Sequence, residues 1–161
     1  MQINSRDEHH QTTQEQTWQG HFGKGYTDRN MMSPVELDSF HQQTYGISRT
    51  EMNADFIGFL DRSVKILEVG ANVGDQLACL RAMDFQNLHG IELQSYAVEV
   101  SKRRKGINII QGSAFDLPYR DGHFDLVFTS GVLIHIAPTD LLNVLREILS
   151  PLRAACFAKR S

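Results

Sequence analysis

The chain has 161 residues, of which 41% are hydrophobic and 22% charged, and its formal net charge is −3. These values describe about one globular domain with a buried core and exclude a chain that is disordered throughout. Without an excess of positive charge, neither nucleic acid nor a membrane is expected as a partner. The two cysteines are too few for a disulfide framework and lack the spacing of zinc ligands. A reducing cytoplasm is therefore the expected location. No run has the apolar length of a signal segment or a membrane span.

The first 62 residues are expected to lie outside the main domain. Residues 1–17 are almost wholly polar, which predicts a mobile tail. Residues 18–62 are expected to form an N-terminal region of one loop and two helices. Its first part, residues 18–30, is rich in Gly and aromatic side chains, which predicts an irregular segment that either forms a lid over a ligand or covers the core.

Two capping boxes predict the helices of this region. Ser33 and Glu36 have the spacing of the first box, which predicts a helix over 33–45 that ends before Gly46. The second box, from Ser48 to Glu51, predicts a helix in which apolar residues recur at helical spacing.

Residues 63–161 are expected to form an α/β domain, because short β-branched segments alternate there with helical ones. Such alternation predicts a mainly parallel sheet with flanking helices and right-handed crossovers. Strands are expected at 64–69, 88–92, 107–111 and 124–130, and helices at 75–83, 95–105 and 140–149.

A glycine turn follows the first of these strands, from Gly70 to Gly74. In an open parallel sheet, ligands bind beyond the carboxyl ends of the strands. Gly70 and Gly74 lack the Cβ atom that would hold a ligand away, although such a turn can also need glycine for packing alone. Glu92 ends the second strand 22 residues after Gly70, near the spacing of a carboxylate that binds a ribose. The pattern therefore predicts a ligand that contains a nucleoside.

The dinucleotide fingerprint G-x-G-x-x-G fails at two positions after Gly70, which are occupied by Asn72 and Asp75. Asp75 at the start of a helix would also repel a pyrophosphate. An NAD-dependent oxidoreductase is therefore disfavoured. A nucleoside without phosphate and with a cationic part, such as S-adenosylmethionine, suits the turn better.

Four segments together resemble the class I S-adenosylmethionine-dependent methyltransferases, in the order of that family. The segment 66–74 (ILEVGANVG) resembles motif I, and 90–93 (GIEL) is similar to the ribose-binding strand end. The segment 111–119 (QGSAFDLPY) is similar to the one that packs along adenine, and 124–136 to the fourth strand and the turn below the methyl group. Within residues 18–30, a W-x-G-x-F-G-x-x-Y-T-x-R-N pattern also resembles the small methylases associated with pseudaminic acid biosynthesis.

The resemblance implies a Rossmann-like class I methyltransferase fold, S-adenosylmethionine as the cofactor, no metal, and a small acceptor such as a sugar or a nonulosonic (pseudaminic) acid derivative. It places the methionine part at Glu68 and Gly70, the ribose at Glu92 and adenine near Ser113. The family usually has Asp at the position of Ser113, so a weaker adenine contact is expected. The implied cofactor-binding residues are Glu68, Gly70, Ala71, Asn72, Gly74, Glu92, Ser113, Ala114, Phe115 and Ser130.

Three features outside the cofactor motifs leave alternatives open. His135 is either the general base for a hydroxyl acceptor or a histidine packed among apolar neighbours. The run Lys102–Lys105 is interpreted as solvated cations at a helix C-terminus rather than as a nucleic-acid patch. His9 and His10 are interpreted as a solvated pair rather than as metal ligands.

The length of the chain is short for this resemblance. The family has a seven-stranded sheet, whereas only four strands are predicted before Ser161. The last strands are therefore expected to be missing, through a frameshift or premature stop near residue 150. The fourth strand would then expose an edge through which two copies pair as a homodimer. The alternative function is a truncated, catalytically impaired domain that binds the cofactor or only mediates interactions.

Overall fold

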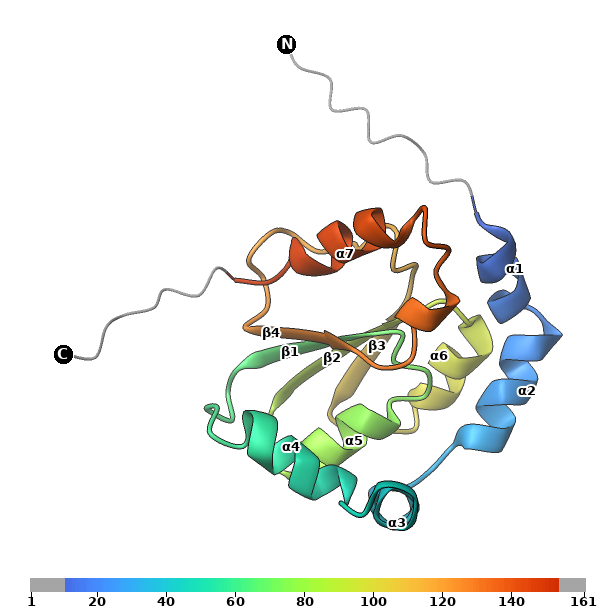
Figure 1. Ribbon diagram of the computed structural model, residues 1–161. Helices are drawn as coiled ribbons and strands as arrows, with labels where there is room; N and C mark the ends of the chain where they lie inside the picture. Colours follow the sequence, from blue (N-terminus) through green and yellow to red (C-terminus); the bar gives the residue numbers. More distant parts are fainter. Residues whose placement is uncertain (1–10, 154–161) are drawn as a thin grey trace.

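The computed structural model describes residues 11–153 (Figure 1). It contains one parallel sheet in the strand order β3-β2-β1-β4. The chain moves outward from β1 through β2 to β3 and then returns to the other side of β1, so the topological switch point lies between β1 and β4. The parallel α/β sheet predicted from the sequence is confirmed. Its strands are β1 (Lys65–Val69), β2 (Asn87–Glu92), β3 (Ile107–Gln111) and β4 (Leu126–Thr129).

Helices cover both faces of the sheet (Figure 1). Alternate residues of β1 point to opposite faces, so Ile66 packs with α5 while Leu67 and Val69 pack with α7. The two resulting apolar clusters form the core and hold the strand ends in place. The helices of these layers are α4 (Arg49–Ile57), α5 (Asp75–Ala82), α6 (Ser95–Ser101) and α7 (Leu141–Leu149), with α3 (Pro34–Tyr45) against α5.

The two predicted capping boxes are present in the structure. Ser33 accepts the backbone N–H of Glu36 and Glu36 accepts that of Ser33, and Ser48 and Glu51 cap α4 in the same way. Gly46 ends α3 with a φ of 76°. One predicted helix is shorter than expected: α6 ends at Ser101 rather than at residue 105.

The N-terminal region corrects two predictions. Residues 1–10, which include His9 and His10, lie outside the described residues. Residues 13–19, predicted to belong to the tail and the loop, form helix α1 (Thr13–Gln19) instead. Most of the predicted irregular segment forms α2 (His21–Asn30). The glycines of this segment do not prevent a helix. Gly23 is needed where α2 meets the end of α1, because a Cβ there would lie 1.7 Å from the carbonyl oxygen of Trp18. Tertiary packing thus overrides the low helix propensity of this segment.

Strand β4 lies at one edge of the sheet, as predicted, but the segment leading into it has a neighbour. Phe124 donates its N–H to the carbonyl of Pro151 at 2.9 Å and accepts the N–H of Arg153 at 2.7 Å. The chain from 151 to 153 therefore runs beside the start of β4, where the sequence predicted no strand. Among residues 11–153, no strand pairs with the outer edge of β4 itself.

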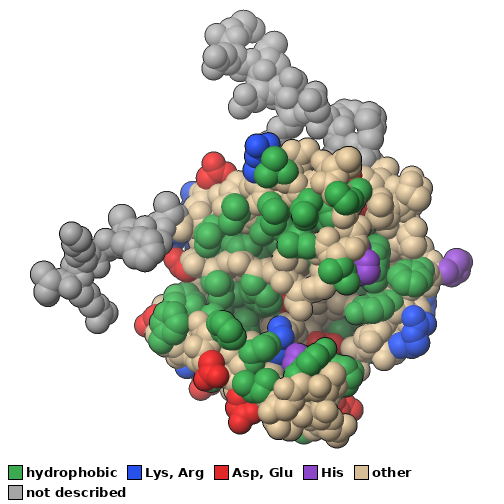
Figure 2. All heavy atoms as spheres, in the orientation of Figure 1, with side chains coloured by type: hydrophobic (Ala, Val, Ile, Leu, Met, Phe, Trp, Pro, Cys, Tyr) green, Lys and Arg blue, Asp and Glu red, His purple; other side chains and the backbone are tan. Residues whose placement is uncertain are grey.

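The surface near α7 is rich in hydrophobic side chains. Figure 2 shows such side chains gathered over this part of the molecule, and Leu142 and Leu149 of α7 are both more than half exposed. Within the described part of the chain, no helix combines the length and the apolar character needed to cross a membrane.

Candidate functional site

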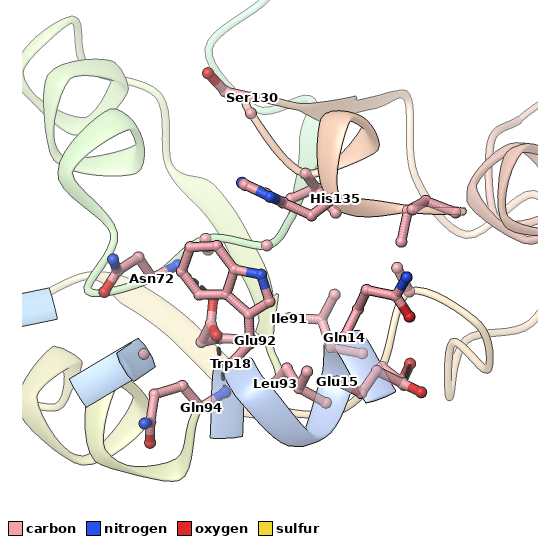
Figure 3. A pocket seen from close by; sticks show the side chains of 18 of the residues that line it. Gln14, Glu15, Trp18, Asn72, Ile91, Glu92, Leu93, Gln94, Ser130 and His135 are labelled. Carbon is pink, nitrogen blue, oxygen red and sulfur yellow. Dashed lines mark hydrogen bonds between the residues drawn. The ribbon is translucent and has the colours of Figure 1, made fainter. Parts of the chain in front are cut away.

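A cavity of about 250 Å³ lies beyond the carboxyl ends of the strands and is covered by α1 and α2 (Figure 3). The switch point between β1 and β4 opens into it, which is where an open parallel sheet binds its ligands. The cavity is lined by His135 and by all the predicted cofactor-binding residues except Gly74: Glu68, Gly70, Ala71, Asn72, Glu92, Ser113, Ala114, Phe115 and Ser130.

The two glycines of the turn are explained by packing. Gly70 and Gly74 have φ values of 77° and 81°, which favour glycine. A Cβ at Gly70 would lie 2.1 Å from the side chain of Val132, and one at Gly74 would lie 2.9 Å from Ile109. Gly74 faces the sheet rather than the cavity, so its lack of a Cβ allows the start of α5 to pack closely against the strands.

Glu68 brings a buried carboxylate to the end of β1. Its side chain is buried, and its Oε2 atom has no hydrogen-bond partner among the described residues. Burial raises the pKa of Glu68 well above the ordinary value, Asp75 and Glu92 raise it further, and the positive charge of Arg49 opposes the shift. A buried carboxylate oxygen without a partner is costly unless a cation or a donor reaches it. The cavity therefore contains an acceptor suited to an ammonium group.

Glu92 ends β2 and is held by backbone donors. Its Oε2 accepts the N–H of Asn72 at 2.8 Å, and its Oε1 accepts the N–H of Gln94 at 2.8 Å (Figure 3). Burial raises the pKa of Glu92, while these backbone hydrogen bonds lower it. A carboxylate has about four lone-pair sites, more than its backbone donors fill, so Glu92 can still accept a hydroxyl from a ribose.

Asn72 and α2 are joined by a hydrogen bond across the cavity wall. Asn72 adopts a left-handed conformation with a φ of 47°, which asparagine tolerates better than most residues. Its Oδ1 accepts the hydroxyl of Thr27 at 3.0 Å, and Thr27 is buried. This bond attaches α2 to the turn after β1.

Glu15 of α1 is a site residue that the sequence analysis missed. It lines the cavity and is only 6% exposed. Its Oε1 accepts the hydroxyl of Ser113 at 2.5 Å, and its Oε2 accepts the N–H of Thr12 at 2.8 Å. The Thr-x-x-Glu capping box at Thr12 is the sequence signal that marks this helix and this carboxylate.

Trp18 of α1 forms the centre of an aromatic group over the cavity. Its ring centroid lies 4.7 Å from that of His135, 5.2 Å from that of Tyr26 and 5.1 Å from that of Phe22, in edge-to-face arrangements. In Figure 3 the indole lies between His135 and Glu92, so the wall formed by α1 and α2 reaches the middle of the site.

His135 lies at the boundary between this cavity and a second one. It ends a short 3₁₀ helix (Leu133–His135), and it is exposed rather than packed among apolar neighbours; the adjacent Ile134 is 80% exposed. The second cavity is an open depression at the surface, with a volume of about 510 Å³. The residues that line both cavities are Gln14, Trp18, His135, Ile136 and Ala137, and the other residues of the second are Thr17, Phe22, Ile134 and Pro138.

The first cavity is lined by several carboxyl groups. No Lys or Arg is found among the described residues that line it, and the carboxylates there are Glu15, Glu68, Asp75, Glu92 and Asp140. Asp75 forms an ion pair with Arg104 and accepts the N–H of Met32 at 3.1 Å. Arg104 was predicted to be a solvated cation; instead, its half-buried side chain stabilises the start of α5. The charge of the cavity disfavours a pyrophosphate and favours a cationic ligand.

The fold and the site together define an α/β protein with a nucleoside-type cavity at the switch point of its sheet. The methyltransferase domain family matches residues 67–155, more than half of the chain, and the chain belongs to this family. Membership implies S-adenosylmethionine as the cofactor, which confirms that sequence prediction. The comparison with curated proteins finds no match.

Solved structures confirm the Rossmann-like methyltransferase fold. A putative S-adenosylmethionine-dependent methyltransferase from Methanococcus maripaludis superposes with a TM-score of 0.63, at 15% identity, over 91% of this chain and 63% of that one. A putative methyltransferase of Haloferax volcanii, bound to the Trm112 methyltransferase activator, gives 0.61 at 18% identity over 81% and 54%. The cyclase SpnF gives 0.57 at 23% identity over 65% and 40%. The chain thus spans less than two thirds of each of these structures.

Proposed function

We propose that the chain binds S-adenosylmethionine in the first cavity and transfers its methyl group to a small acceptor. The observation that carries this proposal is the acidic cavity without Lys or Arg among its described lining residues. S-adenosylmethionine carries a sulfonium and an ammonium against one carboxylate and has no phosphate, so its net charge is positive. A nicotinamide dinucleotide is anionic, and the same carboxylates oppose it.

Glu68, Glu92 and the segment after β3 are proposed to hold the three parts of the cofactor. The unpaired oxygen of Glu68 suits the ammonium of the methionine part. The free lone pairs of Glu92 suit the ribose hydroxyls. Ala114 and Phe115 line the part of the cavity next to Ser113 and are proposed to flank adenine.

His135 is proposed to accept the proton of a hydroxyl acceptor. When bound, the cofactor supplies a methyl group activated by the sulfonium, so the protein contributes mainly alignment and exclusion of water. The position of His135 between the two cavities supports a role where cofactor and acceptor meet. The wall formed by α1 and α2 is proposed to act as a lid, because it covers the cavity and reaches its centre through Trp18.

The second cavity is proposed to receive the acceptor, for which a sugar or a nonulosonic acid derivative remains our prediction. Its volume of about 510 Å³ suits a small molecule. His135 is the only residue with a titratable side chain among its described lining residues. Because no Lys or Arg faces a carboxylate there, a neutral sugar derivative fits this cavity better than its acid form.

Binding and transfer are tested in sequence. Equilibrium dialysis with S-adenosylmethionine and with NAD measures the first step, and we expect binding of the former only. Transfer of tritiated methyl to a panel of nucleotide sugars and nonulosonic acids, in neutral and acid forms, measures the second. Folded protein that does not bind S-adenosylmethionine contradicts the proposal. Binding without transfer to any acceptor supports a catalytically impaired cofactor-binding domain.

We further propose that two copies of the chain pair through the outer edge of β4. This edge presents unpaired backbone groups over Leu126–Thr129 within the described part of the chain, and exposed hydrophobic side chains of α7 lie nearby (Figure 2). Light scattering during gel filtration is expected to give the mass of a dimer. A Leu126→Pro variant is expected to shift it to a monomer, because Asp125 bonds to β1 and Phe124 bonds outward, which places the N–H of Leu126 on the outer edge. A wild-type monomer at high concentration contradicts this pairing.

A further inference from the structure

We propose that Glu15 selects the base of the cofactor by accepting a hydrogen bond from the exocyclic amine of adenine. This inference rests on the proposed S-adenosylmethionine site and assigns to it a specificity-determining residue from α1. Glu15 lies at the end of the cavity formed by α1 and the segment after β3, on the same side as Gln14 and Leu93 (Figure 3).

Two contacts fix the carboxylate of Glu15 at this end of the cavity. The N–H of Thr12 donates to Oε2 at 2.8 Å, which belongs to the capping box of α1. The hydroxyl of Ser113 donates to Oε1 at 2.5 Å, and Ser113 follows β3. Segments 98 residues apart therefore orient one carboxylate. Since Glu15 is 6% exposed, water does little to weaken a hydrogen bond that it accepts.

Ser113 cannot donate a hydrogen bond into the cavity while this arrangement holds. A serine hydroxyl has one proton, and that proton is directed at Glu15. Its oxygen also accepts the N–H of Phe115 at 3.1 Å, so only one lone pair remains. Both Ser113 and Glu15 consequently present acceptors at this end of the cavity.

The amide of Gln94 adds no donor there. Its Nε2 atom donates to the carbonyl oxygens of Gln19 and Gly20, each at 3.2 Å, and its Oε1 accepts the N–H of Tyr96 at 2.9 Å. An exocyclic amine brings hydrogen-bond donors to the acceptors of Glu15 and Ser113. An oxo group in the same position would bring lone pairs against a negative charge, so the site favours 6-aminopurine over 6-oxopurine.

The test compares two ligands that differ only in this group. Isothermal titration calorimetry measures the affinity of S-adenosylhomocysteine and of S-inosylhomocysteine, in which an oxo group replaces the amine. The wild type is expected to prefer the amine by about 100-fold or more, because the oxo group brings lone pairs rather than donors to the buried carboxylate. Glu15→Gln is expected to reduce this preference at least about tenfold, because its side-chain amide is uncharged and can donate to the oxo group.

Glu36→Gln is the matched control. Glu36 has the same place in the capping box of α3, is exposed and does not line the cavity. Glutamine is acceptable at this place in a capping box, so both variants should keep their helices. The control is expected to keep the wild-type preference, and an equal loss in both variants would overturn the assignment of Glu15.

The outcomes separate this inference from the proposed function. If the wild type binds neither ligand, the proposed function fails. If it binds S-adenosylhomocysteine and Glu15→Gln keeps the full preference for the amine, the inference fails and the function stands. Should Glu15→Gln not fold, Ser113→Ala removes the contact that orients the carboxylate and is expected to lower the preference severalfold. An unchanged preference in that variant also overturns the inference.

Discussion

The two walls of the cavity differ in what holds their residues in place. On the side of the strand ends, Glu68 and Glu92 extend from central strands of a closely packed sheet, and backbone donors orient Glu92. On the side of α1 and α2, side-chain hydrogen bonds join Glu15 to Ser113 and Thr27 to Asn72, and Gln94 donates to the backbone between the two helices. The first wall is part of the core, whereas the second is an attached cover. Substitutions in the first should therefore affect folding and binding, and those in the second should affect mainly binding.

The largest effect is expected from Gly70→Ala in the strand-end wall. The new Cβ would lie 2.1 Å from Val132 at a φ of 77°. We expect a loss of about 3 kcal/mol in the free energy of unfolding, because overpacking adds to the conformational strain. Chemical denaturation measures this loss.

Gly131→Ala provides a control for the backbone strain in that measurement. Gly131 also has a φ of 77°, but a Cβ there would meet nothing within 4 Å. This variant should lose only about 1 kcal/mol, which is the cost of the conformation alone. Equal losses in the two variants would show that the contact with Val132 is unimportant.

Glu68→Gln is expected to weaken S-adenosylmethionine binding by about 10- to 100-fold, because the ammonium loses a charged acceptor. The same variant should be more stable than the wild type at neutral pH. Burial raises the pKa of Glu68 in the folded protein above its unfolded value, so its ionisation destabilises the fold. Calorimetry and denaturation measure the two opposite effects.

The pH dependence of this difference has a definite sign. Below the unfolded pKa, Glu68 is protonated in both states and costs nothing. As the pH rises through the raised folded pKa, the wild type loses stability that Glu68→Gln keeps. The free energy of unfolding of Glu68→Gln should therefore exceed that of the wild type by a growing amount as the pH rises from acid to neutral. A constant difference would show that Glu68 is not buried as an ionised group.

A smaller effect on binding is expected from Trp18→Ala in the attached wall. The variant loses the ring contacts with His135 and Tyr26, each worth about 1 kcal/mol. We expect about tenfold weaker cofactor binding and faster hydrogen exchange in α1 and α2, with unchanged exchange in the sheet. Phe22→Ala, at a half-exposed ring, should change binding less. Loss of protection in β1 would contradict the separation of the two walls.

The smallest effect is expected from Thr27→Val, which keeps the shape of the side chain and removes its hydroxyl. The hydrogen bond to Asn72 is worth about 1 kcal/mol, so binding should weaken severalfold. Thr17→Val is the matched control, because the hydroxyl of Thr17 bonds only to the carbonyl of Thr13 in its own helix. Titration calorimetry on both variants checks whether the bond across the walls contributes to the site.

Local sequence patterns were sufficient to predict the sheet and most of the strand-end wall. Short β-branched segments, a glycine turn and the spacing from Gly70 to Glu92 arise from neighbouring residues, so they can be read along the chain. The structural reason for Gly70 and Gly74 could not be predicted from neighbouring residues. Only the structure places Val132 against Gly70 and Ile109 against Gly74, so packing explains both positions.

The capping box at Thr12 marks helix α1, but the position of the N-terminal wall over the cavity could not be predicted because it depends on distant partners. A polar segment containing Glu15 resembles a tail until Ser113, 98 residues away, meets its carboxylate. The weaker adenine contact expected at Ser113 was inferred without Glu15, because that carboxylate comes from a helix far away in the sequence.

The sequence by itself determined the parallel α/β fold, the family and the acidic residues at the strand ends, because these depend on periodicity and short-range spacing. The tertiary structure alone decided that α1 and α2 cover the cavity, that Arg104 pairs with Asp75 and that His135 faces two cavities. These features depend on contacts between segments far apart in the chain. The free energy of such contacts is set by the folded arrangement and not by the local sequence.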